Sequence, residues 1–231
     1  IATRLTPDAV IAALEAAGLK SVATGVEHGT VTAIASGRPF EITTLRRDVE
    51  TDGRRAVVAF TQDWTEDAQR RDFRLNAVYA DRSGALFDPT GAGVADARAG
   101  RIVFVGDAAM RVREDYLRIL RFFRFFAWYG EGAPDAAALA ACAALKDGLA
   151  GLAAERVTKE LLKLLAAPDP RAALRLMAQT GVLAAILPKA DDLSVFEAMV
   201  ALSPDPLLRL AALAPRDAAA TATALRLSNA Q

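Results

Sequence analysis

The chain has 231 residues, of which 53% are hydrophobic and 24% are charged, and its formal net charge is +0. This composition excludes a disordered or fibrous protein, and the balanced charge excludes a uniformly basic surface for nucleic acid. The single cysteine, Cys142, excludes an internal disulfide or a metal-thiolate cluster. That single cysteine fits a reducing cytosol, so we expect a cytoplasmic location. No apolar run approaches the length of a membrane span, so we expect no membrane segment.

The first 90 residues carry mixed helix and strand signals. Thr6 and Pro7 are typical of a helix start, and Gly18 is typical of its end. Runs of β-branched residues predict strands over 30–36 and 40–45, joined as a hairpin.

Three further segments complete this part of the chain. The charged segment 46–55 has almost nothing to bury, which predicts a mobile loop. A helix over 65–71 and a second hairpin, made by residues 76–80 and 85–87, follow. Residues 96–106 have the character of a linker.

After Met110 the signals are helical and no strand is predicted. Residues 111–128 read as one helix that is apolar on most sides. Proline and glycine residues separate the later helices, which we expect over 136–146, 155–166, 171–179, 193–202, 206–214 and 216–227. The chain is therefore predicted to be α+β, with a mixed first part and an all-α remainder.

A stripe of charged residues runs along the expected helix 111–128. Asp115, Arg118, Arg121 and Arg124 recur every third residue, so they share one slowly winding face. Guanidinium groups on a buried helix need anionic partners. The nearby acids, Glu114 and Asp115, are too few for these arginines, which favours a polyanionic ligand such as a nucleoside triphosphate. A salt-bridge network to acids elsewhere in the chain is an equal alternative.

Asp115 and Arg118 have complementary hydrogen-bonding chemistry. The carboxylate accepts from an amine, and the guanidinium donates to a ring nitrogen or carbonyl. Cytosine and adenine both present an amine beside an acceptor nitrogen, whereas guanine and uracil present the opposite order. Such a pair would accept C and A. An ordinary ion pair between residues three apart is the alternative.

The segment 70–77 joins a predicted helix to a predicted strand. Arginines there suit phosphate binding because the guanidinium fork matches phosphate oxygens. Asp72 and Asn76 could hold a ribose hydroxyl, or the segment could be a capping cluster. Glu41 lies within a predicted strand, where, taken alone, solvent exposure is the favoured interpretation.

Four segments together resemble the class II tRNA nucleotidyltransferase and bacterial poly(A) polymerase family, which includes the CCA-adding enzymes. They are residues 40–46 (FEITTLR), 70–77 (RRDFRLNA), 88–89 through 106–107, and 114–121 (EDYLRILR). The resemblance extends from residue 1 to about residue 190. Its specificity lies in the order and spacing of the segments.

This resemblance implies three parts. They are a head with a small nucleotidyltransferase-type mixed sheet over 1–90, a neck with the base-recognition helix over 91–150, and a helical body over 151–231. The segment 46–55 matches a flexible loop that governs how nucleotide addition proceeds.

The resemblance also implies roles for single residues. Asp115 and Arg118 would hydrogen-bond the incoming base, and Glu114 would orient them. Arg71, Arg121 and Arg124 would contact the triphosphate or sugar, with Asp72 and Asn76 nearby. Glu41 would be a third acid near the metals.

One departure from the family pattern is serious. The family has a Gly-Gly-x-x-Arg-Asp phosphate loop followed by an Asp-x-Asp pair that binds Mg²⁺, and the match places residues 1–3 at or just after that pair. Neither motif occurs in the sequence. We therefore expect the 231 residues to be a fragment, or to lack a front segment, and to be inactive alone.

The function implied is template-independent addition of C and A to the 3′ end of tRNA from CTP and ATP, with Mg²⁺ as cofactor. Poly(A) addition, which needs only ATP, is an alternative because the Asp/Arg pair accepts both bases. An inactive module that binds RNA or nucleotide is a third. The sequence does not report the oligomeric state.

Overall fold

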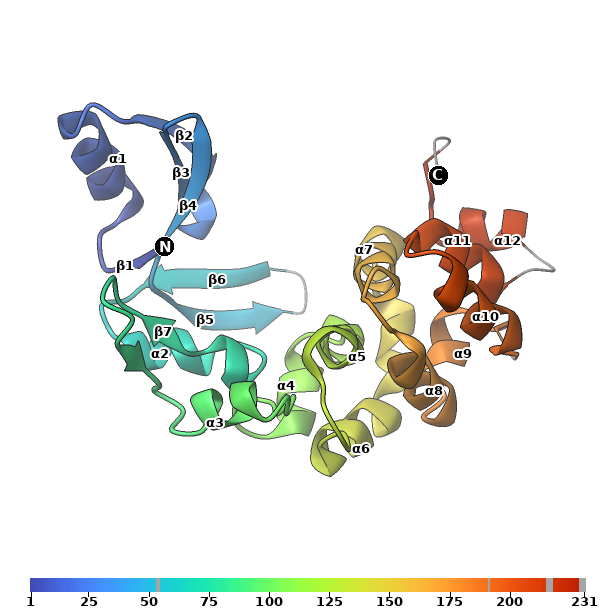
Figure 1. The fold of residues 1–231 in the computed structure, drawn as a ribbon. Helices are drawn as coiled ribbons and strands as arrows, with labels where there is room; N and C mark the ends of the chain where they lie inside the picture. The colour runs from blue at the N-terminus through green and yellow to red at the C-terminus, as the bar shows by residue number, and fades with distance from the viewer. Residues whose placement is uncertain (53–54, 191, 215–217, 229–231) are drawn as a thin grey trace. The chain divides into compact units, whose positions relative to one another are not determined.

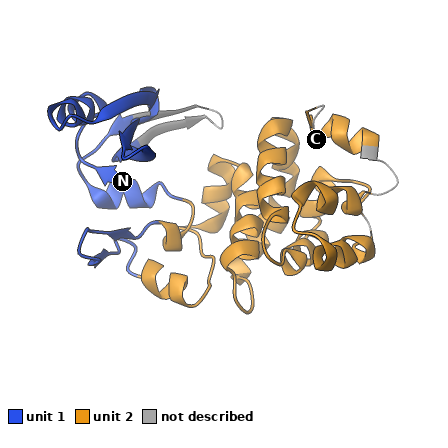
Figure 2. Cartoon of the chain, turned by 45° about the horizontal axis from the view of Figure 1, so that its top comes forward, with its two compact units in different colours: residues 1–71, 77–91 blue, residues 72–76, 92–231 orange. Residues whose placement is uncertain are grey.

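The computed structural model describes residues 1–52, 55–190, 192–214 and 218–228 (Figure 1). The chain divides into two compact units (Figure 2). The first unit holds residues 1–71 and 77–91, and the second holds residues 72–76 and 92–231. The three-part division expected from the sequence stays a prediction, because this partition places the expected neck and body in one unit.

The first unit contains a four-stranded mixed sheet with the strand order β1-β4-β3-β2. Its elements are β1 (Ala2–Thr3), α1 (Pro7–Ala16), β2 (Lys20–Gly25), a short 3-10 turn (Val26–His28), β3 (Thr30–Ala35) and β4 (Arg38–Thr44). β1 pairs parallel to β4, whereas β3 pairs antiparallel to both β2 and β4. The predicted α+β class and the β3–β4 hairpin are confirmed. β1 and β2 were not predicted.

Helix α1 packs its apolar stripe on this sheet. The Thr6 side chain accepts a hydrogen bond from the backbone N–H of Ala9, which caps the helix as its sequence predicts. Val10 and Leu14 form a small core with Val31 and Ala33 of β3.

The expected mobile loop over 46–55 is wrong for the described residues, which lie in a hairpin. Strands β5 (Arg46–Asp52) and β6 (Arg55–Phe60) pair antiparallel, and residues 53–54 lie outside the described part of the chain. The reason is the strand-forming run that follows the charged segment, since it supplies a strand with which the polar segment pairs, apart from an irregularity between Asp48 and Glu50.

The remaining elements of the first unit are short. Helix α2 (Trp64–Gln69) is capped by Asp63, and β7 (Tyr79–Ala80) pairs with β8 (Leu86–Phe87), which confirms the second hairpin. Its first strand begins later than expected, because residues Arg74–Asn76 form a 3-10 turn. The Asn76 side chain accepts the backbone N–H of Phe73 and stabilises that turn at 3.2 Å.

In the second unit, the described residues beyond 110 form helices and turns, as predicted. The helices are α3 (Gly93–Arg98), α4 (Ala108–Glu114), α5 (Leu117–Tyr129), α6 (Ala136–Ala144), a 3-10 segment (Lys146–Gly151), α7 (Ala154–Leu165), α8 (Arg171–Gln179), α9 (Val182–Ile186), α10 (Ser194–Leu202), α11 (Pro206–Leu213) and α12 (Ala218–Ala224). α3 replaces part of the expected linker. None of the helices described is both long and apolar enough to cross a bilayer.

The expected single helix over 111–128 is wrong, because Asp115 divides it. Its backbone is extended, with φ −154° and ψ 107°, so α4 ends at Glu114 and α5 begins at Leu117. The Asp115 carboxylate accepts the backbone N–H of Leu117 at 3.1 Å. An aspartate that bonds a nearby main-chain N–H competes with the helical hydrogen bond, which explains the break.

Helix α5 lies at the centre of the second unit. Ile119, Phe122 and Phe123 are fully buried there, and α5 packs against α7 and α8. Phe73 and Phe104 join the same core, with ring centroids 4.8 Å apart.

Arg209 on α11 is a buried cation held by main-chain oxygens. Its guanidinium donates to the carbonyls of Leu165 (2.6 Å), Ala167 (2.7 Å), Ser203 (2.7 Å) and Val200 (3.3 Å). These carbonyls belong to the last turns of α7 and α10 and the residues just after them. One side chain therefore joins the C-terminal ends of two helices to a third.

Candidate functional site

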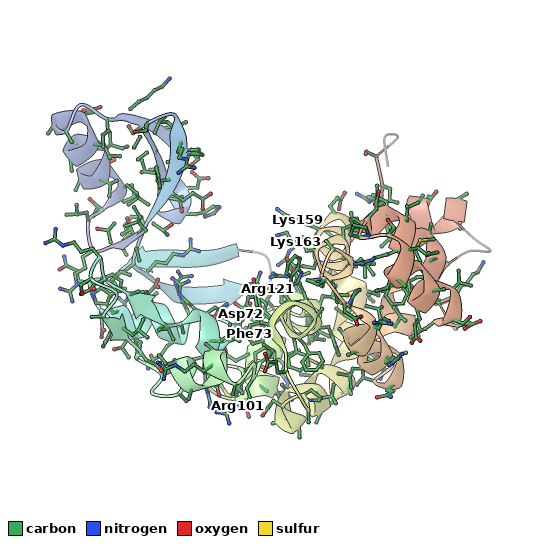
Figure 3. All side chains as sticks on the ribbon, viewed as in Figure 1. Asp72, Phe73, Arg101, Arg121, Lys159 and Lys163 are labelled. Atoms are coloured by element: carbon green, nitrogen blue, oxygen red, sulfur yellow. The ribbon has the colours of Figure 1, made fainter. Side chains whose placement is uncertain are left out.

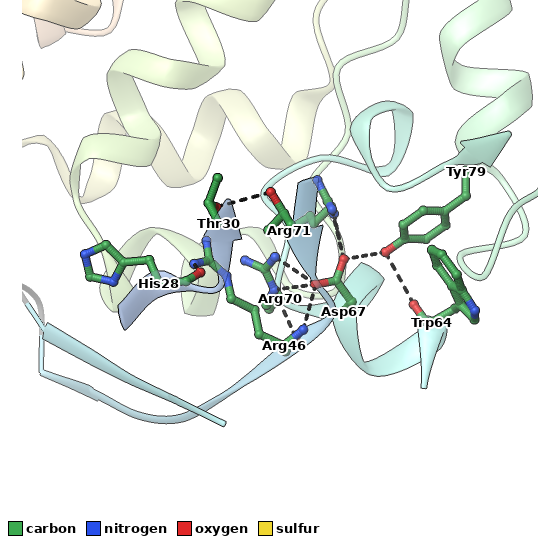
Figure 4. A network of polar contacts seen from close by, with 9 residues as sticks. His28, Thr30, Arg46, Trp64, Asp67, Arg70, Arg71 and Tyr79 are labelled. Carbon is green, nitrogen blue, oxygen red and sulfur yellow. Dashed lines mark hydrogen bonds and ion pairs between the residues drawn. The ribbon is translucent and has the colours of Figure 1, made fainter. Parts of the chain in front are cut away.

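Asp67 lies at the centre of a polar cluster in the first unit (Figure 4). Its side chain is 1% exposed, and each carboxylate oxygen accepts three hydrogen bonds. Oδ1 accepts hydrogen bonds from Nε and Nη2 of Arg70 and from the backbone N–H of Arg46, at 2.8–3.1 Å. Oδ2 takes Nε and Nη2 of Arg71 at 3.3 and 2.9 Å, and the Tyr79 hydroxyl at 2.6 Å.

The cluster sets the ionisation of its members. Burial alone would raise the pKa of Asp67, but the hydrogen bond from Tyr79 and the charges of Arg70 and Arg71 outweigh it and lower that pKa to about 2. Burial and the neighbouring Asp67 carboxylate raise the pKa of Tyr79 to about 12. Arg71 also lies over the Tyr79 ring, 5.6 Å from its centroid.

In the second unit, Glu114 holds two arginines at the end of α4. Arg111 donates to its Oε2 at 2.5 Å, and Arg118 forms an ion pair with the same oxygen. Arg118 also donates from Nη1 to the carbonyl of Arg111 at 2.8 Å. Arg118 is only 9% exposed, so Glu114 and the end of α4 fix its guanidinium.

Asp115 pairs with a residue that sequence reasoning did not find. Its Oδ2 accepts from Nη2 of Arg156 on α7 at 2.8 Å. The alternative of an ordinary Asp115–Arg118 ion pair is absent from the described contacts, since Arg118 pairs with Glu114. Asp115 lies in the break between α4 and α5, where its backbone is not helical, and Arg118 lies in the first turn of α5.

The other two arginines of the stripe are paired within the second unit. Arg121 forms an ion pair with Asp72, and both side chains are labelled in Figure 3. Arg124 Nε donates to Glu160 on α7 at 2.6 Å. Arg121 also lies 3.9 Å from Glu160.

The charge-balance argument for a polyanion is therefore wrong, because acids distant in sequence supply the partners. The prediction that Arg121 and Arg124 bind a nucleotide therefore depends on the family resemblance alone. Asn76 serves the 3-10 turn described above, and Asp72 serves Arg121, so neither shows a ribose site by itself.

The described residues do not form a metal site by themselves. Among them, no three His, Cys, Asp or Glu side chains lie close enough together to hold a metal ion. Glu41 is an exposed carboxylate on β4, and its backbone carbonyl accepts from the N-terminal amine of Ile1 at 2.6 Å. A lone carboxylate does not fit the coordination that Mg²⁺ requires.

Asp67, Arg156 and Glu160 are the polar residues that sequence reasoning did not assign. A signal existed for Asp67, which lies three and four residues before Arg70 and Arg71 on one helix face. Arg156 and Glu160 meet α5 only through tertiary packing of α7, which sequence spacing does not reveal.

Comparison with known proteins places this chain in a family. The model described as the poly A polymerase head domain matches residues 1–103, and the model described as the probable RNA and SrmB-binding site of polymerase A matches residues 133–193. The chain belongs to the class II tRNA nucleotidyltransferase and bacterial poly(A) polymerase family. The resemblance inferred from the sequence is confirmed.

Individual members of the family match over most of the chain. A mouse protein named mitochondrial CCA tRNA nucleotidyltransferase 1 is 39% identical over 220 residues, which are 92% of this chain and 50% of the relative. A CCA-adding enzyme of Geobacillus stearothermophilus is 39% identical over 187 residues, or 79% of this chain and 44% of the relative. The chain thus spans about half the length of the curated relatives it matches.

A solved structure shares the fold. The crystal structure of Bacillus stearothermophilus CCA-adding enzyme in complex with CTP matches with a TM-score of 0.80 and 33% identity. The match covers 99% of this chain and 57% of the solved chain. Both units of this family member therefore have counterparts in that structure.

Proposed function

We propose that the protein containing this chain adds C and A to the 3′ end of tRNA, using CTP and ATP as substrates. The observation that carries the proposal is the 33% identical match, over 99% of this chain, to a CCA-adding enzyme in complex with CTP. Arg118 and Asp115 supply the chemistry that selects these two bases. We propose the cytoplasm as its location, although the mouse relative is named as mitochondrial.

Arg118 is held in a way that suits base recognition. Its hydrogen bonds with the described residues use Nη1, which donates to Glu114 and to the Arg111 carbonyl. The Nε and Nη2 groups make no hydrogen bond with the described residues, and they form the edge of the fork that can donate to two acceptors. Cytosine offers such a pair of acceptors in its ring nitrogen and carbonyl oxygen.

Asp115 suits the complementary role. Its oxygens accept from the Leu117 N–H and from Arg156, and a carboxylate has about four lone-pair sites. It can therefore also accept the exocyclic amine of cytosine or adenine. The same carboxylate faces a carbonyl oxygen in uracil or guanine, where two acceptors would meet.

We propose Mg²⁺ as the cofactor, with Glu41 near it. The parallel register pairs Ala2 with Thr43, so a residue preceding Ile1 in a longer chain would lie beside Glu41. The acids that the family carries at that position would then join Glu41. This proposal depends on the family pattern, since the described residues alone do not fit the ion.

The test uses a form of the protein that carries the family's Asp-x-Asp pair before the position of Ile1. It is incubated with Mg²⁺, tRNA lacking its terminal CCA, and each labelled nucleotide in turn. We expect incorporation of C and A and none of U or G. Long tracts from ATP alone would support poly(A) addition, and no incorporation would support a binding module.

Arg118→Ala in that protein tests base recognition directly. We expect discrimination against UTP and GTP, measured as the ratio of kcat/KM values, to fall by about tenfold or more, because a charged hydrogen bond contributes about 1.5–3 kcal/mol. Arg113→Ala is the matched control, since Arg113 is an exposed arginine on the adjoining helix. Unchanged discrimination in Arg118→Ala would refute the role.

A further inference from the structure

Asp67 lies outside the proposed base-recognition pair, yet it is the most heavily hydrogen-bonded carboxylate among the described residues. Its two oxygens are divided between two arginines. Oδ1 serves Arg70 and the backbone of Arg46, whereas Oδ2 serves Arg71 and Tyr79 (Figure 4). A carboxylate that accepts six hydrogen bonds within 3.3 Å fixes the direction of every donor around it.

The Arg71 guanidinium is one of the two guanidinium groups that Asp67 holds by two hydrogen bonds each, and it is the more exposed of the two. Its Nε and Nη2 both donate to Oδ2 of Asp67, and its plane lies over the Tyr79 ring. The Tyr79 hydroxyl donates to the same Oδ2, which closes a triangle of three side chains. Asp67 is 1% exposed, but the Arg71 side chain is 32% exposed. Arg71 is therefore a charged member of the triangle that a ligand can reach, whereas Asp67 is not accessible.

We propose that Asp67 is a positioning residue that holds Arg71 for contact with the triphosphate of the incoming nucleotide. This inference rests on the proposed function. A guanidinium loses less freedom on meeting a phosphate when its torsions are already fixed. Asp67 therefore acts on the nucleotide through Arg71 and makes no contact with it.

Asp67 also fixes the start of the β5–β6 hairpin. Its Oδ1 accepts the backbone N–H of Arg46, the first residue of β5, at 3.1 Å. Arg70 Nε donates to the Arg46 carbonyl at 3.0 Å, and Arg46 Nη1 donates to the His28 carbonyl at 2.6 Å. One buried carboxylate thus fixes both the orientation of the proposed phosphate-binding arginine, Arg71, and the position of the first residue of the hairpin.

The experiment measures binding of CTP and CMP to the protein and to Asp67→Asn by titration calorimetry. An asparagine amide presents one oxygen and one NH₂ group, so it cannot accept from both arginines. We expect CTP affinity to fall about tenfold and CMP affinity to change less than about twofold, since CMP carries only one of the three phosphates that the triphosphate offers to Arg71. Equal losses for the two nucleotides would overturn the proposal.

A double-mutant cycle identifies the route of the effect. If Asp67 acts through Arg71, Asp67→Asn should cause no further loss of CTP affinity in an Arg71→Ala background. Losses that multiply in the double variant would overturn the proposal. Asp63→Asn is the matched control, because it removes a carboxylate from the same helix while an asparagine keeps the N-cap.

A gentler variant covers the case in which Asp67→Asn does not fold. Tyr79→Phe removes one hydrogen bond from Oδ2 and leaves the Arg71 pair in place, so we expect a smaller, CTP-specific loss. An equal effect on CTP and CMP would again overturn the inference. Failure of the unmodified protein to bind CTP more tightly than CMP would instead refute the proposed function, which keeps the two failures distinct.

Discussion

Replacing Glu160 by glutamine tests the ion pairs that join α7 to the arginine stripe of α5. Glu160 is 5% exposed, and its carboxylate lies 2.6 Å from Arg124 Nε and 3.9 Å from Arg121 Nη1. Glutamine keeps the length and one acceptor oxygen but removes the negative charge. The Arg124 side chain is 15% exposed, so it would be left as a cation without its anion in a largely buried position.

The expected magnitude follows from these contacts. A hydrogen bond to a charged group contributes about 1.5–3 kcal/mol, so Glu160→Gln should lower the free energy of unfolding by about 2 kcal/mol. Glu160→Ala also removes the acceptor, and breaking a buried pair costs about 3–5 kcal/mol. Because Arg121 keeps Asp72 as a partner in either variant, most of the loss in unfolding free energy comes from the broken pair with Arg124.

The assay follows urea unfolding by the fluorescence of Trp128 in a Trp64→Phe background. Trp128 is on α5, and its indole N–H donates to the Lys163 carbonyl of α7 at 2.7 Å. Its emission therefore reports the contact between the two helices. The sequence contains two tryptophans, so the background substitution leaves one reporter, which lies in the second unit.

Arg124→Gln supplies the control for this prediction. Once Arg124 is neutral, Glu160→Gln should cost much less than it does alone, because the pair no longer exists. A loss below about 0.5 kcal/mol for Glu160→Gln alone is the size of an ordinary surface substitution and would refute the reasoning. An equal loss from Glu160→Gln with Arg124 present and with Arg124→Gln would refute it as well.

Two further predictions concern stability. The lowered pKa of Asp67 contributes about 2 kcal/mol of stability, which is present above pH 3.8 and lost as the pH falls toward 2. Acid unfolding followed by circular dichroism should lack this pH-dependent component in Asp67→Asn. An acid transition identical to that of the unmodified protein would contradict the assignment. Gly148→Ala would place a Cβ 2.1 Å from the Tyr116 ring and should cost about 1–3 kcal/mol in urea unfolding. Gly151→Ala, which meets open space, should cost much less; equal costs would exclude the clash as the cause.

Local signals predicted the elements whose hydrogen bonds are local. The cap at Thr6 and the β-branched runs of β3 and β4 gave the right structures, because adjacent residues complete them. The β5–β6 hairpin was missed because its polar strand depends on a partner that follows it. The break at Asp115 was missed because the surrounding residues are strong helix formers, and one carboxylate outweighs them.

The partners of the candidate site residues were predicted less well than the helices and strands. Glu114 and Arg118 are four positions apart, so their ion pair is local in sequence even though the break at Asp115 lies between them. The pairs of Arg121 with Asp72 and of Arg124 with Glu160 join residues 49 and 36 positions apart. Counting only neighbouring acids therefore made the stripe look short of anions. Whether Asp115, Arg118 and the other expected residues bind nucleotide stays a prediction.

The way in which Arg209 is bound has a consequence for the helical unit. Its acceptors are main-chain carbonyls at the ends of α7 and α10, and such oxygens neither gain protons in acid nor exchange partners with dissolved ions as carboxylates do. The junction of α7, α10 and α11 should therefore keep its geometry across solution conditions that loosen the carboxylate-linked contacts of α5. Side-chain replacement cannot abolish these acceptors either, since every amino acid at those positions supplies one.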